Sequence, residues 1–442
     1  MKFYNREKEL EAMEKVRQTA FSVHSQMLVL TGRRRIGKTS LIFKSCENTP
    51  TVYLFISRSN ETDLCSRFVA EIRQSLDIYV PEFVRFADLF RFLMDLGTHM
   101  AYNLVIDEFQ EFHYINQEIY SLMQDAWDRY RKQSHINLIV SGSVYTLMNK
   151  IFKDSKEPLY GRADNIMKLT PFNTSVLKEI IADHKPDYTP DDLLALYTFT
   201  GGVPKYIEQF MDNGCTDMES MVDFMLQPDS SFLTEGQALL IQEFGKKYGN
   251  YFSILSAISN GKNTLPEIET LMGETSIGGQ LKRLEEDYNL VKKKRPILSK
   301  ENTQTVRYEV ADLFLRFWFR YFIKYQNYIE IGNLERLADI IKKDYPTFSG
   351  LALEMYFRQQ LIESKAFADV GAWWQGKNNK EQDEIDIVAL YAEENKALVA
   401  EVKRQSKNFK PDTFAQKVET LRKKVLFKYD IDSRLFSMED ML

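Results

Sequence analysis

The chain has 442 residues, of which 44% are hydrophobic and 13% aromatic, so it can bury the cores of two or three domains and is not a disordered protein. A formal net charge of −5 excludes a globally basic protein, so any binding of nucleic acid must be local. The three cysteines, Cys46, Cys65 and Cys215, have no paired spacing, which argues against a disulfide framework and a zinc site.

The first 172 residues alternate apolar runs with amphipathic stretches. This alternation predicts an α/β domain with a parallel sheet covered by helices on both faces. The expected strands are 26–31, 51–56, 103–107, 137–141 and 166–169.

A phosphate-binding motif follows the first of these strands. Gly32, Gly37, Lys38 and Thr39 have the spacing G-x-x-x-x-G-K-T, and Ser40 lies in the helix that follows. The glycines let the backbone wrap a phosphate, while the helix directs free N–H groups and its positive dipole end at the anion. Lys38 is expected to reach the β- and γ-phosphates of ATP, and the Thr39 hydroxyl to bind Mg²⁺. The predicted nucleotide-binding segment is Gly32, Arg33, Arg34, Arg35, Ile36, Gly37, Lys38, Thr39 and Ser40.

Two acidic residues, Asp107 and Glu108, lie at the end of the strand expected at 103–107. Asp107 is expected to make the second contact to Mg²⁺, since it follows a strand beside the phosphate loop. Glu108 is the candidate general base that activates water for attack on the γ-phosphate. Ser141 or Ser143, at the end of the next strand, is expected to sense that phosphate; an ordinary Ser/Gly turn before a helix is the alternative.

The middle of the chain is predicted to be helical. Residues 173–232 are expected to form a lid, and 233–325 contain helices followed by a hairpin around the basic run Lys292–Arg295, which is typical of a winged helix. That basic run either binds DNA or is a solvated edge. The aromatic segment 313–322 is expected to pack helices between domains. The helices expected in the winged-helix region are 236–245, 249–259 and 276–287.

Residues 326–442 carry a second group of candidate catalytic side chains. Glu354 lies on a helix expected at 350–363, Asp386 on one expected strand, and Glu401 and Lys403 on the next. Three carboxylates and a lysine brought together would bind Mg²⁺ and act on a phosphodiester, whereas a solvent face of mixed charge is the alternative. A local excess of basic residues suits a phosphate backbone, or is the polar side of a helix: Lys403, Arg404, Lys407, Lys410, Lys417, Arg422, Lys423 and Lys424.

Together these segments resemble the STAND-type, AAA+-like P-loop ATPases of archaea and bacteria whose C-terminal part is the domain known as DUF234. The phosphate loop and Val105–Gln110 match the family's two nucleotide-binding motifs. The opening Phe3–Leu10 resembles a family box near the adenine, which implies a contact from Arg6. Arg162 resembles an arginine that faces the nucleotide, and Pro204 resembles the proline of a signature that closes over adenine.

The end of the chain resembles the PD-(D/E)XK nuclease core placed in this family. The matching residues are Glu354, Asp386, Glu401 and Lys403, with the first three as metal ligands. The resemblance implies a restriction-endonuclease-like α/β domain and metal-dependent cleavage of DNA.

The sequence therefore predicts an ATP-hydrolysing molecular switch that uses Mg²⁺. Its fold would be a P-loop sheet with a helical lid, a winged-helix module and a nuclease-like α/β domain. Two outputs stay open: DNA cleavage, or a regulatory scaffold whose C-terminal domain binds DNA or protein without cutting. A small-molecule kinase has weak support, and a homo-oligomer is compatible with the sequence. The charged N-terminus and the lack of the ~18 apolar residues that span a bilayer predict a cytoplasmic protein without membrane contact.

Overall fold

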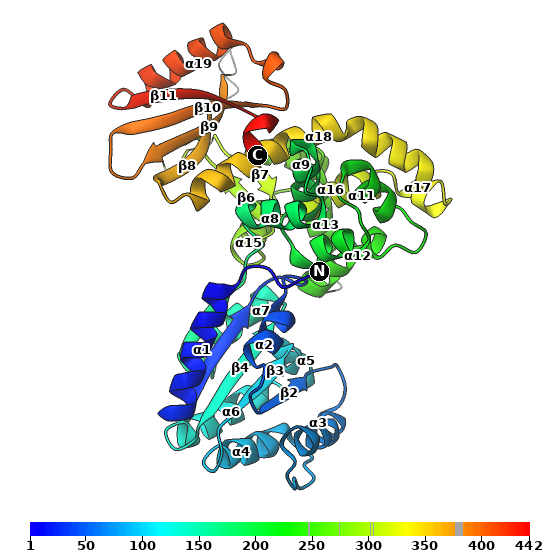
Figure 1. Cartoon of the computed structure of the whole chain (residues 1–442), viewed down its shortest axis with the longest axis vertical. Coiled ribbons are helices and arrows are strands. Elements are labelled where there is room, and N and C mark those ends of the chain that lie inside the picture. The colour runs from blue at the N-terminus through cyan, green and yellow to red at the C-terminus, as the bar shows by residue number, and fades with distance from the viewer. Residues whose placement is uncertain (246–247, 274, 301, 304, 376–382) are drawn as a thin grey trace. The chain divides into compact units, whose positions relative to one another are not determined.

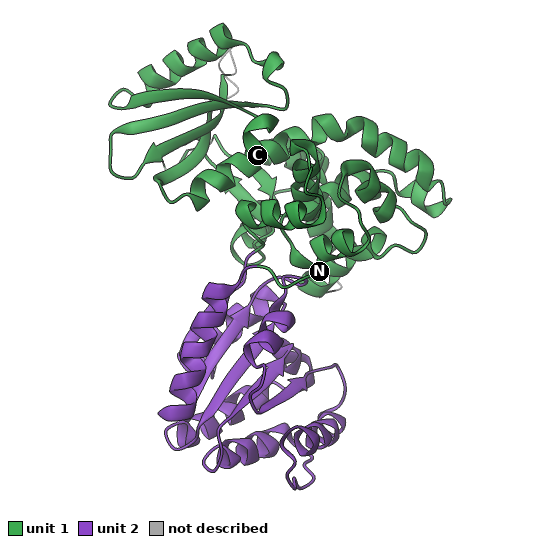
Figure 2. Cartoon of the chain, in the orientation of Figure 1, with its two compact units in different colours: residues 1–4, 171–442 green, residues 5–170 purple. Residues whose placement is uncertain are grey.

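The chain folds into two compact units, shown in different colours in Figure 2. The N-terminal unit is Asn5–Thr170, and the C-terminal unit is Met1–Tyr4 with Pro171–Leu442. The further limits expected within 173–442 stay predictions. The computed structural model, drawn in Figure 1, describes residues 1–245, 248–273, 275–300, 302–303, 305–375 and 383–442.

The N-terminal unit is built on a five-stranded parallel sheet with the order β2-β3-β4-β1-β5. Every residue of β1, β3 and β4 is buried, as in sheets that helices cover on both faces. The predicted strands are confirmed to within one residue at each end. Their bounds are β1 (Gln26–Thr31), β2 (Thr51–Phe55), β3 (Tyr102–Asp107), β4 (Ile136–Gly142) and β5 (Asn165–Lys168).

Helices cover the two faces of this sheet. Leu28 and Leu30 of β1 pack with α1 and α2, whereas the alternate residues Met27 and Val29 pack with α3, α4, α6 and α7 on the other face. The helices are α1 (Glu7–Ser22), α2 (Lys38–Ser45), α3 (Glu61–Leu76), α4 (Phe86–Leu96), η1 (Phe109–Glu111), α5 (Phe112–Ile115), α6 (Glu118–Tyr130) and α7 (Tyr145–Lys153).

The C-terminal unit opens with helices. Thr189 and Asp192 form a capping box at the start of α9, and Pro190 occupies its first turn. α13, α14 and α15 are followed by an antiparallel hairpin, the element order expected of a winged helix. The elements are α8 (Thr174–His184), α9 (Pro190–Thr200), α10 (Pro204–Asp212), α11 (Met218–Met225), α12 (Ser231–Phe244), α13 (Gly249–Ser259), α14 (Leu265–Leu271), α15 (Gly278–Glu286), β6 (Val291–Lys294) and β7 (Arg307–Val310).

The aromatic segment continues from the hairpin as α16 (Leu313–Trp318), a π-helical turn (Phe319–Ile323) and α17 (Gln326–Glu330). It packs inside the C-terminal unit, where the ring of Phe317 lies 5.0 Å from that of Phe199 in α9.

A long helix, α18 (Leu334–Glu363), follows and begins 16 residues before the start that the sequence predicted. Pro346 lies inside it and is the reason for the error, because proline usually marks a helix start or break. The buried Leu337, Ile341, Tyr345 and Phe348 recur at helical spacing through this position and hold the helix together.

A close approach of α12 to α16 depends on Gly236. A Cβ at this position would lie 2.2–2.7 Å from ring atoms of the buried Trp318, whose indole N–H donates to the Leu233 carbonyl at 3.0 Å. We expect Gly236→Ala to destabilise the protein by about 1–3 kcal/mol, as overpacking does, despite the better helix propensity of alanine. The thermal midpoint measures this, with Gly249→Ala as control, because its Cβ would meet nothing within 4 Å. Equal midpoints for the two variants would contradict the close approach.

The last part of the C-terminal unit is a four-stranded sheet with the order β11-β10-β9-β8. β8, β9 and β10 are antiparallel, and β11 runs parallel to β10. Residues of α18 pack on one face and residues of α19 on the other. The bounds are β8 (Phe367–Trp374), β9 (Glu384–Tyr391), β10 (Lys396–Lys403), η4 (Ser406–Asn408), α19 (Pro411–Lys424), β11 (Asp430–Ser437) and η5 (Met438–Met441).

Among the helices that the structure describes, none combines the length and apolar character needed to cross a membrane.

Candidate functional site

The phosphate loop joins β1 to α2 at the carboxyl edge of the sheet. Gly37 precedes α2 with φ of 87°, a left-handed conformation that glycine adopts without strain. Gly37 offers no side chain to cap α2, and the first N–H groups of a helix, which lack acceptors within it, are suited to bind an anion. The Lys38 ammonium lies across the loop and donates to the carbonyls of Gly32 at 2.9 Å and Arg33 at 3.2 Å. The loop therefore combines backbone donors with a buried cation.

Asp107 meets the loop from the end of β3. Its Oδ2 accepts hydrogen bonds from the Thr39 hydroxyl at 3.2 Å and from the Tyr53 hydroxyl at 2.5 Å. Burial, reinforced by Asp107, raises the pKa of Tyr53, so this phenol stays a donor. A carboxylate and a hydroxyl so close together are a suitable pair of oxygen ligands for Mg²⁺. Tyr53 carries no motif and was missed by the sequence prediction.

Glu108 follows Asp107 in a left-handed backbone conformation, with φ of 54°, and its N–H donates to Asp107 Oδ1 at 2.9 Å. Its Oε2 accepts hydrogen bonds from Ser143 Oγ at 2.7 Å and from Gln110 Nε2 at 2.5 Å. Of the two candidate serines, Ser143 reaches this carboxylate and Ser141 does not. The Ser141 hydroxyl is fully buried inside β4 and finds no hydrogen-bond partner in the described part of the chain.

A second charged cluster lies in the C-terminal unit, where β9 and β10 meet. Lys403 Nζ lies 2.9 Å from Glu401 Oε1 and 3.8 Å from Asp386 Oδ2, and Lys417 Nζ approaches Glu401 Oε1 at 3.2 Å. The Val402 N–H donates to Asp386 Oδ2 at 2.8 Å. Burial opposes protonation of Lys403, but the bond to Glu401 and the charge of Asp386 prevail and raise its pKa. Lys403 is therefore a cation that joins two carboxylates.

Glu354 lies on α18 and forms an ion pair with Arg358. Arg358, one turn along, donates to Glu354 Oε2 at 2.6 Å and to the Asp386 carbonyl at 3.0 Å. Burial raises the pKa of Glu354, although Arg358 opposes the shift. Within the described residues, no group of three or more His, Cys, Asp or Glu side chains is arranged to hold a metal ion. Joint binding of a metal by Glu354, Asp386 and Glu401 stays a prediction.

Two family models match parts of this chain. Residues 3–210 match the model of an ATPase domain predominantly from Archaea. The chain carries an archaeal-type ATPase domain. Residues 318–414 match DUF234, described as archaeal and bacterial proteins of unknown function, so the predicted resemblance to these two domains is confirmed.

Two proteins illustrate the likeness. An uncharacterized protein of Methanocaldococcus jannaschii is 28% identical over 465 residues, which cover 99% of both chains. The solved structure of a Walker-type ATPase of Pyrococcus abyssi is 20% identical, with a TM-score of 0.54 over 72% of this chain and 96% of that one. The second likeness shows the P-loop ATPase fold.

Two further predicted residues of the ATPase domain lie at opposite edges of its sheet. Arg6 is buried near the phosphate loop, where it donates to the Thr170 carbonyl at 2.7 Å and pairs with Glu9 at 3.0 Å. Arg162 precedes β5, pairs with Asp128 at 3.0 Å and lies at the amino edge. Because parallel strands separate the two edges, Arg162 does not reach the phosphate loop of its own unit.

The remaining predicted nucleotide contacts differ in exposure. Ile36 is buried beneath the loop, while Arg34 and Ser40 are exposed and Arg33 and Arg35 are half-buried.

Pro204 belongs to the C-terminal unit, at the first turn of α10. The glycine before this turn, Gly202, has φ of 79°, and a Cβ there would lie 2.5 Å from the Phe172 carbonyl oxygen. A contact of Pro204 with adenine stays a prediction.

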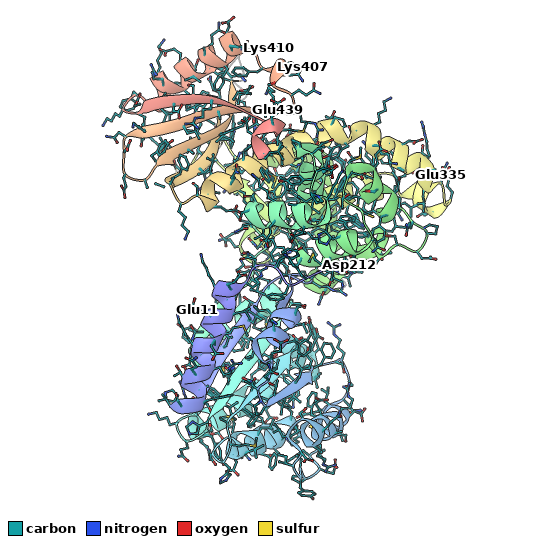
Figure 3. The ribbon with its side chains drawn as sticks, viewed as in Figure 1. Glu11, Asp212, Glu335, Lys407, Lys410 and Glu439 are labelled. Carbon is teal, nitrogen blue, oxygen red and sulfur yellow. The ribbon has the colours of Figure 1, made fainter. Side chains whose placement is uncertain are left out.

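The basic residues of the DUF234 region are divided between pairs and open surface. Lys417 and Lys403 contact Glu401, and Arg404 pairs with Asp191 at 2.7 Å. Lys407 and Lys410 are exposed beside the start of α19 and project outward in Figure 3. Only part of the predicted basic set is therefore presented to solvent.

Proposed function

We propose that the chain is a Mg²⁺-dependent, ATP-hydrolysing molecular switch. The observation that supports it most strongly is the meeting of Lys38, Thr39 and Asp107 at one edge of the sheet, with Glu108 beside them. In this proposal Lys38 leaves the carbonyls of its own loop to bind the β- and γ-phosphates. The backbone amides that begin α2 hold the other phosphate oxygens.

Mg²⁺ fits the residues present. The Thr39 hydroxyl and the Asp107 carboxylate, 3.2 Å apart, would be its protein ligands, and phosphate oxygens and water would complete the coordination. The ion supplies charge neutralisation of the transferred phosphoryl group. Tyr53 keeps Asp107 oriented through its hydrogen bond.

Glu108 is the proposed general base, and its bond to Ser143 gives the switch a local element. A γ-phosphate near the Ser143 hydroxyl would compete for the hydrogen bond that now goes to Glu108. Release of Glu108 would then allow it to activate water only when a triphosphate is bound. The proposed readers of this state are the predicted lid, 173–232, through Pro204 at the adenine, and the winged-helix module, 233–325.

Removal of metal tests this proposal directly. We expect purified protein to hydrolyse ATP slowly in Mg²⁺, to lose turnover with excess EDTA and to regain it when Mg²⁺ is restored. Phosphate release measured over time gives the rate. Turnover that persists in EDTA would contradict the assigned roles of Thr39 and Asp107.

Metal-dependent DNA cleavage by the DUF234 region is a second candidate function. It is favoured by the convergence of Asp386, Glu401 and Lys403, and by the element order α18-β8-β9-β10-α19-β11 around one sheet. Two carboxylates are sufficient for Mg²⁺ when substrate phosphates supply further oxygens. Lys403 would stabilise charge on the phosphodiester, while Glu354 orients Arg358 instead of binding metal. The alternative is a regulatory or scaffolding ATPase whose C-terminal part binds DNA or protein without cutting.

A plasmid assay separates these outputs. If the site is a nuclease, Lys403→Ala should reduce nicking in Mg²⁺ by roughly 10²-fold or more, because removal of one partner of a close charge group costs several kcal/mol. Lys396→Ala is the matched control, since this exposed lysine lies at the other end of β10. Absence of nicking by the wild type with ATP, ADP or no nucleotide would favour the scaffold.

A further inference from the structure

A cavity of about 270 Å³ lies in the C-terminal unit, between the β6–β7 hairpin, α16, α18 and the start of β9. Its size is at the lower end of the range of small-molecule pockets, about 300 Å³. The lining contains five basic and three acidic side chains: Lys294, Arg307, Arg316, Arg320, Arg358, Glu309, Glu354 and Glu384. The lining thus has more basic than acidic side chains.

Four of the five basic groups already have acidic partners. Arg307 pairs with Glu384 at 2.6 Å, Arg358 with Glu354 at 2.6 Å, and Arg320 with Asp344 at 2.9 Å; Lys294 contacts Glu309. These pairs hold the walls of the cavity.

Arg316 differs from the other four. Its guanidinium lies against the ring of Phe348, 5.0 Å from the centroid, and its buried Nη1 finds no acceptor among the described residues. An unsatisfied charged donor costs several kcal/mol in a folded protein unless a ligand completes it. Burial lowers the pKa of Arg316 to about 10, as is expected where positive charge is poorly compensated.

We propose that this cavity binds the phosphoryl group of a small phosphate monoester, with Arg316 as its central ligand. The guanidinium fork of Arg316 matches phosphate oxygens, and a phosphate anion would pair with the one lining cation that has no acidic partner among the described residues. The volume leaves room for a small organic group beside the phosphate. The neighbouring carboxylates of Glu309 and Glu354 limit the affinity for anions.

The occupant also has a structural consequence. The cavity is bounded by β7 of the hairpin and by Glu354 and Arg358 of α18, next to Asp386. A bound phosphate would draw Arg358 toward it and weaken the bond between Arg358 and Glu354. A bound phosphate monoester would therefore change the surroundings of Asp386 in the second charged cluster, independently of ATP binding.

The test uses the full chain carrying Lys38→Ala, so that the phosphate loop contributes no binding. We expect calorimetry to detect ribose 5-phosphate and, more weakly, inorganic phosphate at millimolar concentration, but not ribose. Arg316→Met, which keeps an apolar stem on Phe348, should weaken binding by at least about tenfold, as loss of one charge-assisted hydrogen bond does. Arg434→Met, an exposed arginine on β11 paired with Asp432, should leave binding unchanged.

A second variant is expected to strengthen phosphate binding, a result that loss of folding cannot produce. Glu309→Gln removes a negative charge from the cavity wall and should therefore tighten phosphate binding severalfold. Glu309 Oε1 accepts no hydrogen bond from the described residues. Binding of inorganic phosphate but not of ribose 5-phosphate would contradict the proposed phosphate monoester and indicate a site for the free phosphate ion. Equal affinity in the Arg316→Met protein, or no binding of either phosphate, would overturn the proposal.

Discussion

Replacement of Lys38 by alanine is expected to abolish ATP binding and turnover. The ammonium is buried and already holds the loop through the carbonyls of Gly32 and Arg33. Its loss removes the cation that faces the β- and γ-phosphates, and truncation of one partner of a buried charge pair costs about 2–5 kcal/mol. The affinity should therefore fall by roughly 10²-fold or more, as measured by equilibrium binding of a labelled ATP analogue.

Lys44→Ala is the matched control for this experiment. Lys44 lies on the same helix, is exposed and pairs with Glu47 at 2.7 Å, so its loss changes the charge of α2 without touching the loop. The affinity of the Lys44→Ala protein for ATP should stay within about twofold of the wild type, since surface ion pairs of this kind contribute little free energy. Normal ATP turnover in Lys38→Ala would refute the assigned site, provided that the thermal midpoint is unchanged.

The sequence was sufficient to predict the sheet and the phosphate loop. β1, β3 and β4 each contain a continuous apolar run, and the loop residues are contiguous in the chain. The rule that parallel strands end at one edge then brings Asp107 to Thr39, without any knowledge of side-chain packing. Local pattern and topology are sufficient for such a site.

The contacts between side chains of neighbouring strands could not be predicted from the sequence. Tyr53 reaches Asp107 because β2 pairs with β3 in one particular alignment, and Ser143, the first residue after β4, reaches Glu108. The pairing of Glu354 with Arg358 did have a signal, since an acid and a base four residues apart on a helix commonly meet. That signal predicts the ion pair, while the role of Glu354 as a metal ligand stays a prediction.

Glu108→Gln should separate ATP binding from ATP hydrolysis. Glutamine keeps the size of the side chain and can still accept from Ser143, now at 2.7 Å from the carboxylate, but it cannot take a proton from water. We expect kcat to fall by roughly 10²–10⁴-fold, the usual contribution of a general base, with ATP affinity nearly unchanged. Single-turnover hydrolysis together with equilibrium ATP binding measures both quantities on one preparation.

Two companions make the interpretation of Glu108→Gln specific. Glu118→Gln changes an exposed glutamate at the start of α6 and should leave kcat unchanged. Ser143→Ala removes one of the two hydrogen bonds on the Glu108 carboxylate and leaves the one from Gln110. It should alter how far hydrolysis depends on the γ-phosphate while keeping much of the rate. If Glu108→Gln loses ATP affinity in proportion to kcat, the carboxylate shapes the loop and is not the base. If kcat alone falls, the carboxylate acts in the chemical step.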